Sequence, residues 1–430
     1  MHRPVALDLV RSIMSSMQTT PRGIDRIELG YFESLLADWP ADVFGLIPTP
    51  WGMRWYPRER IVEGVAFFKR IWRETGSAEG DPVLARLRRE IPGTEPVLVP
   101  PAKRKTRRRD LLSAYGQTAR MLIGDKWSFG RPLSTMPQGA IYLNIGHFGL
   151  GYPIFLRWLD RRPDVKSVFM IHDTIPLDRP DLCQPSTTQA HHRLMEATAR
   201  HADQLIVPTP AAGETLRAEL ARRGARDIPI AAVPLPIDDI FRRPVAPDPV
   251  LSAHPYFVIC GAVESRKNHL LLLNIWPDLV RRHPGREPKL VIAGSRGFMS
   301  DQVFYMIEKS DVLRRHVHFA TGMSSPALAA LMANARAVVM PSFTEGFGLP
   351  PVEGMVLGTP AVLSDIGAHR DAAGAHGVFI DPTDGPGWLE ALSGLVDDTG
   401  FAAAKARVAS FRAHDWPSYM REIGTTLAGV

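Results

Sequence analysis

The sequence predicts an α/β protein with two domains, each built around a sheet of parallel strands. The first observation is size, since 430 residues, 45% of them hydrophobic, suffice for two separate cores. The second is alternation: short apolar runs alternate with helical stretches in two successive series, as in parallel sheets. The third is a break between these series, which is typical of a linker. Prolines crowd the chain there, at Pro234, Pro236, Pro244, Pro247 and Pro249.

The first series predicts an N-terminal domain over residues 1–240. A helix is expected to open with Gly23 and Asp25, after the first strand. Residues 49–135 fit the series poorly and are predicted to be a variable insertion. The strands are expected at residues 5–9, 43–48, 141–145, 167–171, 204–207 and 229–233.

The second series predicts a C-terminal domain over residues 253–412, joined to the first domain by a linker at residues 241–252. Its apolar runs are short and nearly continuous, which is typical of strands buried on both faces. The strands are expected at residues 256–260, 290–293, 317–320, 337–340, 361–363 and 378–380.

Positive charge and aromatic residues are concentrated in the insertion. The net charge is +6 and the sequence pI about 9.4, so an anionic partner is expected. Lysine and arginine crowd residues 101–131. Just upstream, Val65, Phe68, Ile71 and Trp72 would share one helix face beside cations, which suits an anionic membrane surface. A solvated insertion with a small core of its own explains the same residues, and both interpretations stay open.

Two features predict a cytoplasmic protein. The apolar start is broken by Asp8 and Arg11, which argues against a signal peptide, and no stretch approaches a membrane span. Cys183 and Cys260 lie far apart and share no metal or redox motif, which fits a reducing compartment. The inner face of the cytoplasmic membrane is the alternative location.

The most informative segment follows the predicted strand 337–340. From Glu345 to Glu353 it reads Glu-Gly-Phe-Gly-Leu-Pro-Pro-Val-Glu. The glycines allow a tight turn, and the prolines suit the first turn of a helix. We therefore expect Glu345 on a loop at the carboxyl end of a strand and Glu353 in the first turn of the next helix. Open α/β sheets bind ligands at this edge.

Two carboxylates one loop apart could hold two sugar rings, because each can accept hydrogen bonds from a vicinal diol. The glycine N–H groups and the helix N-terminus could meet a phosphate between them. The alternative is that Glu353 only caps the helix dipole and Glu345 is solvated. The glycine-rich loop between them favours the sugar.

Two other pairs of polar residues follow predicted strands. Arg266 and Lys267 combine a fork-shaped and a point cation, which suits a diphosphate. A basic helix start explains them less well, because cations are unfavourable at a helix N-terminus. His172 and Asp173 follow the strand 167–171, where a ligand would lie. A histidine with a purely structural role in the loop is the alternative.

These segments resemble the retaining, nucleotide-sugar-dependent glycosyltransferases of family 4. The resemblance lies in the two glutamates of Glu345 to Glu353, in Val-Ile-Cys-Gly-Ala-Val-Glu-Ser-Arg-Lys-Asn at 258–268, and in the whole segment 335–374. Thr-Pro-Arg-Gly-Ile-Asp-Arg-Ile-Glu at 20–28 and Ile-His-Asp-Thr-Ile-Pro at 171–176 are similar to a bacterial polysaccharide-type subgroup. The resemblance covers most of the chain and is weak over 49–135.

The resemblance implies the GT-B fold, in which two Rossmann-like domains face each other across a cleft that holds the active site. The N-terminal domain would bind the acceptor and the C-terminal domain the nucleotide sugar. The final helix, about 416–427 within the segment 413–430, would cross back to the first domain.

The resemblance also implies roles for single residues. Glu353 would hold the ribose and Glu345 the hexose, while Arg266 and Lys267 would hold the diphosphate. His172 would face the transferred sugar as a catalytic residue. Asp173 would orient His172 or accept a proton from the acceptor. The other donor-binding residues implied are Gly23, with Arg22 and Arg26 adding charge, and Gly294, Met323, Phe347, Gly348 and Leu349.

The implied activity is transfer of a hexose, with GDP-mannose the preferred donor, to a saccharide or polyprenyl-linked saccharide acceptor. This reaction would belong to exopolysaccharide or lipopolysaccharide synthesis. We expect no cofactor and no metal, since no Asp-x-Asp pair is present, and no nucleic-acid partner. A GT-B epimerase, a phosphorylase, or a non-catalytic scaffold that binds membrane or nucleic acid is the alternative. Intact Glu345, Glu353, Arg266 and Lys267 argue against the scaffold.

Overall fold

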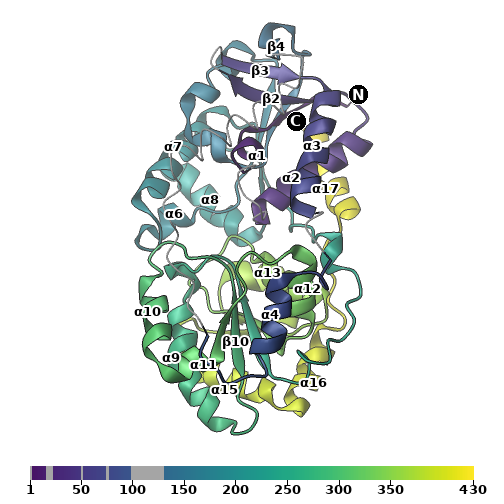
Figure 1. Ribbon diagram of the computed structural model, residues 1–430. Coiled ribbons are helices and arrows are strands. Elements are labelled where there is room, and N and C mark those ends of the chain that lie inside the picture. The colour runs from purple at the N-terminus through teal and green to yellow at the C-terminus, as the bar shows by residue number, and fades with distance from the viewer. Residues whose placement is uncertain (1, 16–22, 50–51, 74–76, 98–129) are drawn as a thin grey trace.

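The computed structural model describes residues 2–15, 23–49, 52–73, 77–97 and 130–430, except the side chains of residues 13–15, 67–73 and 148. It forms two lobes, each with a central sheet flanked by helices (Figure 1). Most of the first half of the chain forms the upper lobe, and most of the second half forms the lower lobe. The predicted class, an α/β protein with two sheets of parallel strands, is confirmed.

The upper sheet has eight strands in the order β4-β3-β2-β1-β5-β6-β7-β8. β3 (Gly52–Tyr56) and β4 (Arg131–Pro132) are antiparallel edge strands within the insertion, and the sequence analysis did not predict them. They are short and partly exposed, so they lack the apolar runs that mark buried strands. The six parallel strands match the prediction. They are β1 (Val5–Asp8), β2 (Val43–Thr49), β5 (Ile141–Asn144), β6 (Lys166–Met170), β7 (Gln204–Val207) and β8 (Ile230–Ala232).

Helices connect these strands and begin where local sequence favours a start. For α8, Pro210 takes the first position and the Thr209 hydroxyl accepts a hydrogen bond from the Ala212 N–H at 3.0 Å. The helices of this lobe are α1 (Val10–Ser15), α2 (Gly23–Asp38), α3 (Arg58–Arg73), α6 (Ile175–Asp178), α7 (Pro185–His201) and α8 (Pro210–Arg222).

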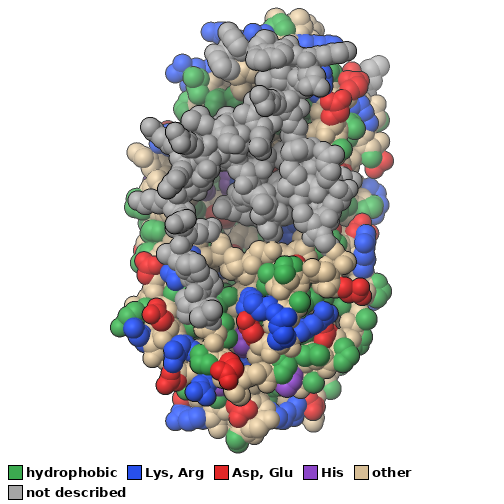
Figure 2. Space-filling view, in the orientation of Figure 1, with side chains coloured by type: hydrophobic (Ala, Val, Ile, Leu, Met, Phe, Trp, Pro, Cys, Tyr) green, Lys and Arg blue, Asp and Glu red, His purple; other side chains and the backbone are tan. Residues whose placement is uncertain are grey.

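The membrane-surface hypothesis falls mainly on residues that lie outside the description. The predicted helix exists as α3, and its Val65 is buried in the core rather than exposed. The side chains of residues 67–73 and the basic stretch 98–129 are not described. On the visible face of the lower lobe, basic and acidic side chains are interspersed (Figure 2). Among the described residues, no helix is both long enough and apolar enough to cross a bilayer.

The lower sheet is entirely parallel, in the order β11-β10-β9-β12-β13-β14. All six strands match the prediction within one residue at either end. They are β9 (Tyr256–Cys260), β10 (Lys289–Ala293), β11 (Val317–Phe319), β12 (Ala337–Met340), β13 (Ala361–Ser364) and β14 (Val378–Ile380). The helices that follow them are α9 (His269–Arg282), α10 (Asp301–Lys309), α11 (Asp311–His316), α12 (Ser325–Ala333), α13 (Leu349–Val356), α14 (Gly367–Ala373), α15 (Gly385–Val396) and α16 (Asp398–Val408).

One helix of the insertion lies in the lower lobe. α4 (Pro82–Glu90) is drawn in dark blue among the green helices of that lobe (Figure 1). At its N-terminus the Asp81 carboxylate accepts a hydrogen bond from Ser324 N–H at 2.8 Å, and further on the Arg86 guanidinium donates to the Phe319 carbonyl. After the helix, Val97 N–H donates to the Arg314 carbonyl at 2.7 Å. The insertion therefore belongs to both lobes.

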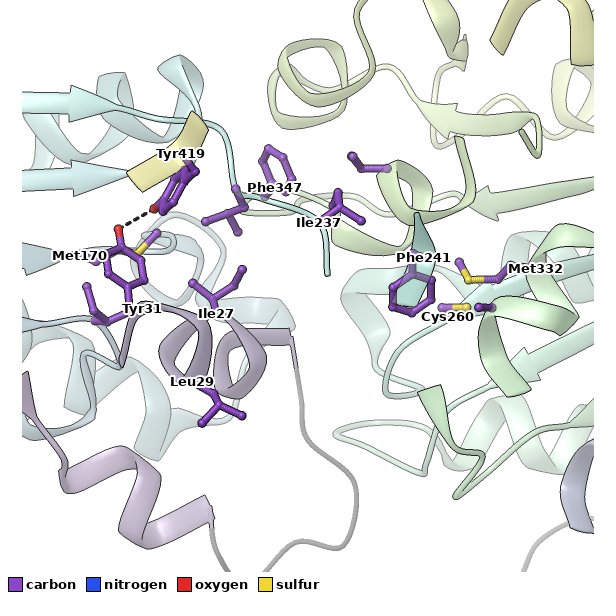
Figure 3. Packing of buried hydrophobic residues seen from close by; sticks show 14 of the residues in the cluster. Ile27, Leu29, Tyr31, Met170, Ile237, Phe241, Cys260, Met332, Phe347 and Tyr419 are labelled. Carbon is purple, nitrogen blue, oxygen red and sulfur yellow. Dashed lines mark hydrogen bonds between the residues drawn. The ribbon is translucent and has the colours of Figure 1, made fainter. Parts of the chain in front are cut away.

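The last helix crosses in the opposite direction, from the lower lobe to the upper lobe. α17 (Trp416–Ala428) follows the lower lobe in sequence but packs on α2 in the upper lobe (Figure 1). The hydroxyl groups of Tyr31 and Tyr419 are 2.6 Å apart and hydrogen-bonded, as Figure 3 shows. Nearby, Phe347 and Ile237 belong to one buried apolar cluster that continues from the upper lobe into the lower lobe (Figure 3).

Candidate active site

The loops after β9 and β12 form the candidate active site. The strand order of the lower sheet reverses between these two strands, so their loops diverge and leave room for a ligand at the carboxyl edge. Arg266 and Lys267 lie in a short 3₁₀ helix, η7 (Ser265–Lys267), after β9, and Glu345 lies after β12. The Phe343 N–H donates to the Arg266 carbonyl at 2.8 Å, which ties the two loops together.

The Glu345 carboxylate is held by three side chains. Arg266 Nη1 donates to one carboxylate oxygen at 2.7 Å, and Lys267 Nζ donates to the other at 2.8 Å. The Ser342 hydroxyl donates to this second oxygen, also at 2.8 Å. The sequence placed these cations and this glutamate at one edge of the sheet, and the structure brings them into direct contact.

Burial alone would raise the pKa of Glu345, because the side chain is almost entirely removed from water. Arg266 and Lys267 outweigh that effect and hold the pKa well below its usual range. The same attraction raises the pKa of Arg266 despite its desolvation. Glu345 is therefore ionised at neutral pH and can only accept hydrogen bonds.

Gly261 provides the space that Lys267 needs. Its φ is +117°, in the region that side chains disfavour, and a Cβ there would lie 2.7 Å from Lys267 Cε. Asn268, with φ +52°, then turns the chain into α9. Arg266 and Lys267 thus precede the helix rather than open it.

Glu353 lies in the second turn of α13. The prediction that it lies in the first turn of this helix was wrong. The helix begins at Leu349, directly after Gly348 in the left-handed conformation (φ +87°), so the two prolines occupy its second and third positions. Glu353 is 3% exposed and pairs with Arg26 of the upper lobe, whose Nη2 lies 2.6 Å from Oε1. Burial raises the pKa of Glu353, although Arg26 acts in the opposite direction.

The loop between the two glutamates packs against the upper lobe. A Cβ at Gly346 would collide with the carbonyl oxygen of His172 and lie 3.2 Å from Asp173 Cβ. Leu349 reaches Gly23, where a Cβ would lie 2.9 Å from its Cδ1. Four of the predicted site residues, from both halves of the chain, therefore meet at this boundary together with Gly346.

His172 and Asp173 follow β6 but do not bond to each other. His172 Nε2 donates to the Ile145 carbonyl at 2.8 Å, and burial lowers the pKa of this histidine to about 4, so the ring is neutral. The Asp173 carboxylate instead accepts from Ile175 N–H at 3.1 Å. The expectation that Asp173 orients His172 was therefore wrong. Burial raises the pKa of Asp173, and His191 and Arg266 oppose this shift.

Gly294 and Met323 make contacts of a structural kind. The Gly261 carbonyl occupies the space that a Cβ at Gly294 would need, so this glycine allows the loops after β9 and β10 to approach. Met323 is 6% exposed and packs in the core. Phe347 is likewise buried, at 6% exposed. Whether Gly294 or Met323 contacts a nucleotide stays a prediction.

The sequence analysis missed His369. This residue follows β13 in α14 and is 1% exposed. Its Nδ1 donates to the Ser364 carbonyl at 3.0 Å, which leaves Nε2 as an acceptor without a partner among the described residues. A Cβ at Gly348 would lie 3.5 Å from that nitrogen. Its position after a strand adjacent to β12 was the signal that could have identified it.

The described part of the chain contains no group of three or more His, Cys, Asp or Glu side chains arranged to hold a metal ion. Among the described residues, positive charge at the candidate active site comes from Arg266, Lys267 and Arg26. These are the groups that could meet a phosphate there.

With the site geometry in place, comparisons identify the class of the lower domain. Residues 254–398 match the family model described as Glycosyl transferases group 1. This region contains β9 to β14 together with Arg266, Lys267, Glu345 and Glu353. Over these residues the lower domain is therefore similar to the group 1 glycosyl transferases.

Curated relatives point to the same class. The chain is 27% identical over 227 residues to the serotype-specific mannosyltransferase WbdA of Escherichia coli, a match over 50% of this chain and 28% of that protein. It is 32% identical over 180 residues to the O-antigen chain mannosyltransferase B of Escherichia coli, over 40% of this chain and 46% of that one. The chain thus spans less than half the length of these relatives.

A solved structure shows the fold of the whole chain. Sucrose-phosphate synthase from Thermosynechococcus elongatus superposes with a TM-score of 0.60 at 17% sequence identity. The match covers 99% of this chain and 98% of that one. The fold is GT-B, as expected from the sequence.

Proposed function

We propose that this protein transfers a hexose from a nucleoside diphosphate sugar to a hydroxyl group of a saccharide, with retention at the anomeric carbon. One observation carries the proposal: Glu345, Arg266 and Lys267 meet between β9 and β12 within hydrogen-bond distance. Two cations suit the diphosphate, and an ionised carboxylate beside them suits the hydroxyl groups of the sugar attached to it.

The donor would lie along the edge of the lower sheet. Arg266 and Lys267 would bind the diphosphate, Glu345 would accept hydrogen bonds from the hexose, and Glu353 would accept them from the ribose. Backbone N–H groups near Phe347 and Gly348 would position the hexose. The positive ends of helices and of backbone amides favour such anionic ligands.

The proposed reaction breaks the bond between the anomeric carbon and the diphosphate oxygen. The acceptor oxygen bonds to the same face of that carbon, and its proton passes to the departing diphosphate. Arg266 and Lys267 stabilise the charge that develops on the leaving group, so no metal is required. His172, neutral and held by the Ile145 carbonyl, would face the transferred sugar from the upper lobe.

Mannose from GDP-mannose is the proposed donor sugar, supported by the two mannosyltransferases among the relatives. The proposed acceptor is a saccharide or polyprenyl-linked saccharide of a bacterial surface polysaccharide. With such an acceptor, the protein would act at the inner face of the cytoplasmic membrane. Co-sedimentation with anionic but not with neutral phospholipid vesicles would support this location, and equal behaviour with both would contradict it.

Glu345→Gln tests the proposal. The amide keeps the shape but loses the charge that pairs with Arg266 and Lys267, so we expect transfer to fall by about 100-fold or more. The measurement is transfer of labelled hexose from GDP-mannose and UDP-glucose, with and without a chelator. Glu390→Gln, on a surface ion pair with Arg282, is the matched control and should retain full activity.

Wild-type rates in Glu345→Gln would contradict the role of this residue. Activity that a chelator abolishes and manganese restores would contradict the metal-free reaction. Conversion of the donor alone into an isomer would identify an epimerase instead.

A further inference from the structure

At the candidate active site, the first turn of α2 in the upper lobe contacts the first two turns of α13 in the lower lobe. Gly23 and Arg26 share one face of α2, three residues apart, and Leu349 and Glu353 share one face of α13, four residues apart. Gly23 meets Leu349, and Arg26 meets Glu353. These two contacts, in the same order along both helices, join the start of α2 to α13.

Arg26 has hydrogen-bonding capacity left after it binds Glu353. A guanidinium has five N–H donors, and among the described residues only Nη2 is used, in the bond to Glu353. The guanidinium carbon lies 5.2 Å from the ring centroid of Phe241, which is fully buried between the lobes. The side chain is 18% exposed, so it is held in place and still reaches solvent.

Arg26 also acts electrostatically on the end of β9, just before the loop that carries Arg266 and Lys267. Cys260, the last residue of that strand, is buried, and burial raises the pKa of its thiol to about 12. Glu353, Lys267 and Arg26 all lie close enough to act on the same thiol. A Cβ at the next residue, Gly261, would lie 3.1 Å from Lys267 Nζ. Arg26 and Lys267 therefore both act electrostatically on the end of β9.

We propose that Arg26 binds the diphosphate of the donor from the upper lobe while it holds Glu353 toward the ribose. The inference rests on the proposed function and extends it, because the donor would then be bound by both lobes at once. An arginine suits this double role, since its planar fork can serve two acceptors, whereas a lysine offers a single point of charge. Arg26 also lies in the first turn of α2, where a cation is unfavourable unless it meets an anion.

The test compares a nucleoside diphosphate with its nucleoside. Binding of GDP, guanosine, UDP and uridine is measured by calorimetry for the wild type, Arg26→Gln and Arg26→Lys. For the diphosphate that the wild type binds, we expect Arg26→Gln to weaken binding about tenfold or more and Arg26→Lys to weaken it less. Affinity for the matching nucleoside should stay within about twofold.

Arg88→Gln is the matched control. Arg88 also pairs with a carboxylate in a segment far away in sequence, Asp248, at 2.6 Å, and lies away from the candidate active site on α4. Its substitution should leave both affinities unchanged. Equal losses for nucleoside and diphosphate in Arg26→Gln would show that Arg26 acts only through Glu353 and would overturn the inference. Unchanged diphosphate affinity would overturn it too. A wild type that binds no nucleoside diphosphate would instead refute the proposed function itself.

Discussion

Each lobe contains a buried glutamate, and the surroundings shift the pKa values of these two glutamates in opposite directions. Glu345 is surrounded by donors, and its pKa falls. Glu28, on α2, is 1% exposed and accepts one hydrogen bond, from the Ser12 hydroxyl at 2.5 Å. Its Oε1 has no partner among the described residues. Burial therefore raises the pKa of Glu28 to about 8, although Ser12 and Arg11 oppose the shift.

This difference predicts a pH dependence of stability. The folded protein keeps the Glu28 proton up to about pH 8, whereas the unfolded chain loses it near pH 4.5. Unfolding then releases a proton, so the free energy of unfolding falls as pH rises from about 4.5 to 8. Glu28→Gln lacks this titration. The stability of Glu28→Gln minus that of the wild type should grow by more than about 1 kcal/mol between pH 5 and 8.

Urea unfolding at several pH values measures the effect. Glu63→Gln, in an exposed pair with Arg60 on α3, is the control and should follow the wild type. Parallel curves for Glu28→Gln and the wild type would show that Glu28 is ionised in the folded protein.

At the scale of residues, the sequence could group site residues correctly where the topology of the sheet alone determines which residues lie close together. Strand ends meet at one edge of a parallel sheet, so Arg266, Lys267 and Glu345 could be grouped before the structure was known. The pairing of Arg26 with Glu353 depends on how two lobes dock, and no local pattern encodes that. The turn assigned to Glu353 was wrong because the left-handed Gly348 lets the helix begin one residue before the prolines.

Among the elements, α4 has the least local explanation. It starts with a good cap, since Asp81 Oδ1 accepts from Val83 N–H at 2.9 Å and Leu84 N–H at 3.1 Å. Burial would raise the pKa of Asp81, but the bonds from Ser324, Leu84 and Val83 outweigh it and lower the pKa. The start of the helix was encoded locally, while its docking on the lower lobe was not.

Leu87→Ala tests that docking. Leu87 is fully buried, so the substitution should lower the free energy of unfolding by about 2–4 kcal/mol. Hydrogen exchange should locate the loss in β11 and α12 of the lower lobe. Arg89→Ala, on the exposed side of the same helix, should change stability by less than about 0.5 kcal/mol. Loss of protection in β5 and β6 instead would place α4 on the upper lobe.

Strands could be predicted well because continuous apolar runs mark burial on both faces. All six strands of the lower sheet and the six parallel strands of the upper sheet were identified in this way. β3 and β4 were missed because an edge strand exposes part of its length and can be as short as two residues.

At the scale of the whole molecule, the two lobes approach so closely at boundary glycines that a side chain there would collide with the other lobe. Gly346 faces the His172 carbonyl, and its φ is not positive, so alanine is acceptable to the local backbone. The three atoms nearest to a Cβ there all belong to His172 and Asp173 of the other lobe. The same boundary carries polar bonds, such as Ala211 N–H to Asp371 Oδ2 at 2.9 Å.

Gly346→Ala should therefore hold the lobes apart without unfolding either. We expect a larger radius of gyration by small-angle X-ray scattering and a loss of transfer of about tenfold or more. Gly394→Ala on α15, where a Cβ would meet nothing within 4 Å, should leave both unchanged. An unchanged radius and rate in Gly346→Ala would show that the lobes do not approach this closely in solution.

α4 docks on the lower lobe although it lies between strands of the upper lobe in sequence, and this has a consequence for biosynthesis. A nascent chain emerges from its N-terminus, so Leu84, Leu87 and Ile91, all fully buried in the finished protein, leave the ribosome before any strand of the lower sheet exists. Their apolar surface has no partner at that stage. The upper lobe can form while the α4 segment is still undocked, but α4 can dock only after β11 and α12 have been synthesised. The two lobes therefore cannot mature as independent units in the order in which they are translated.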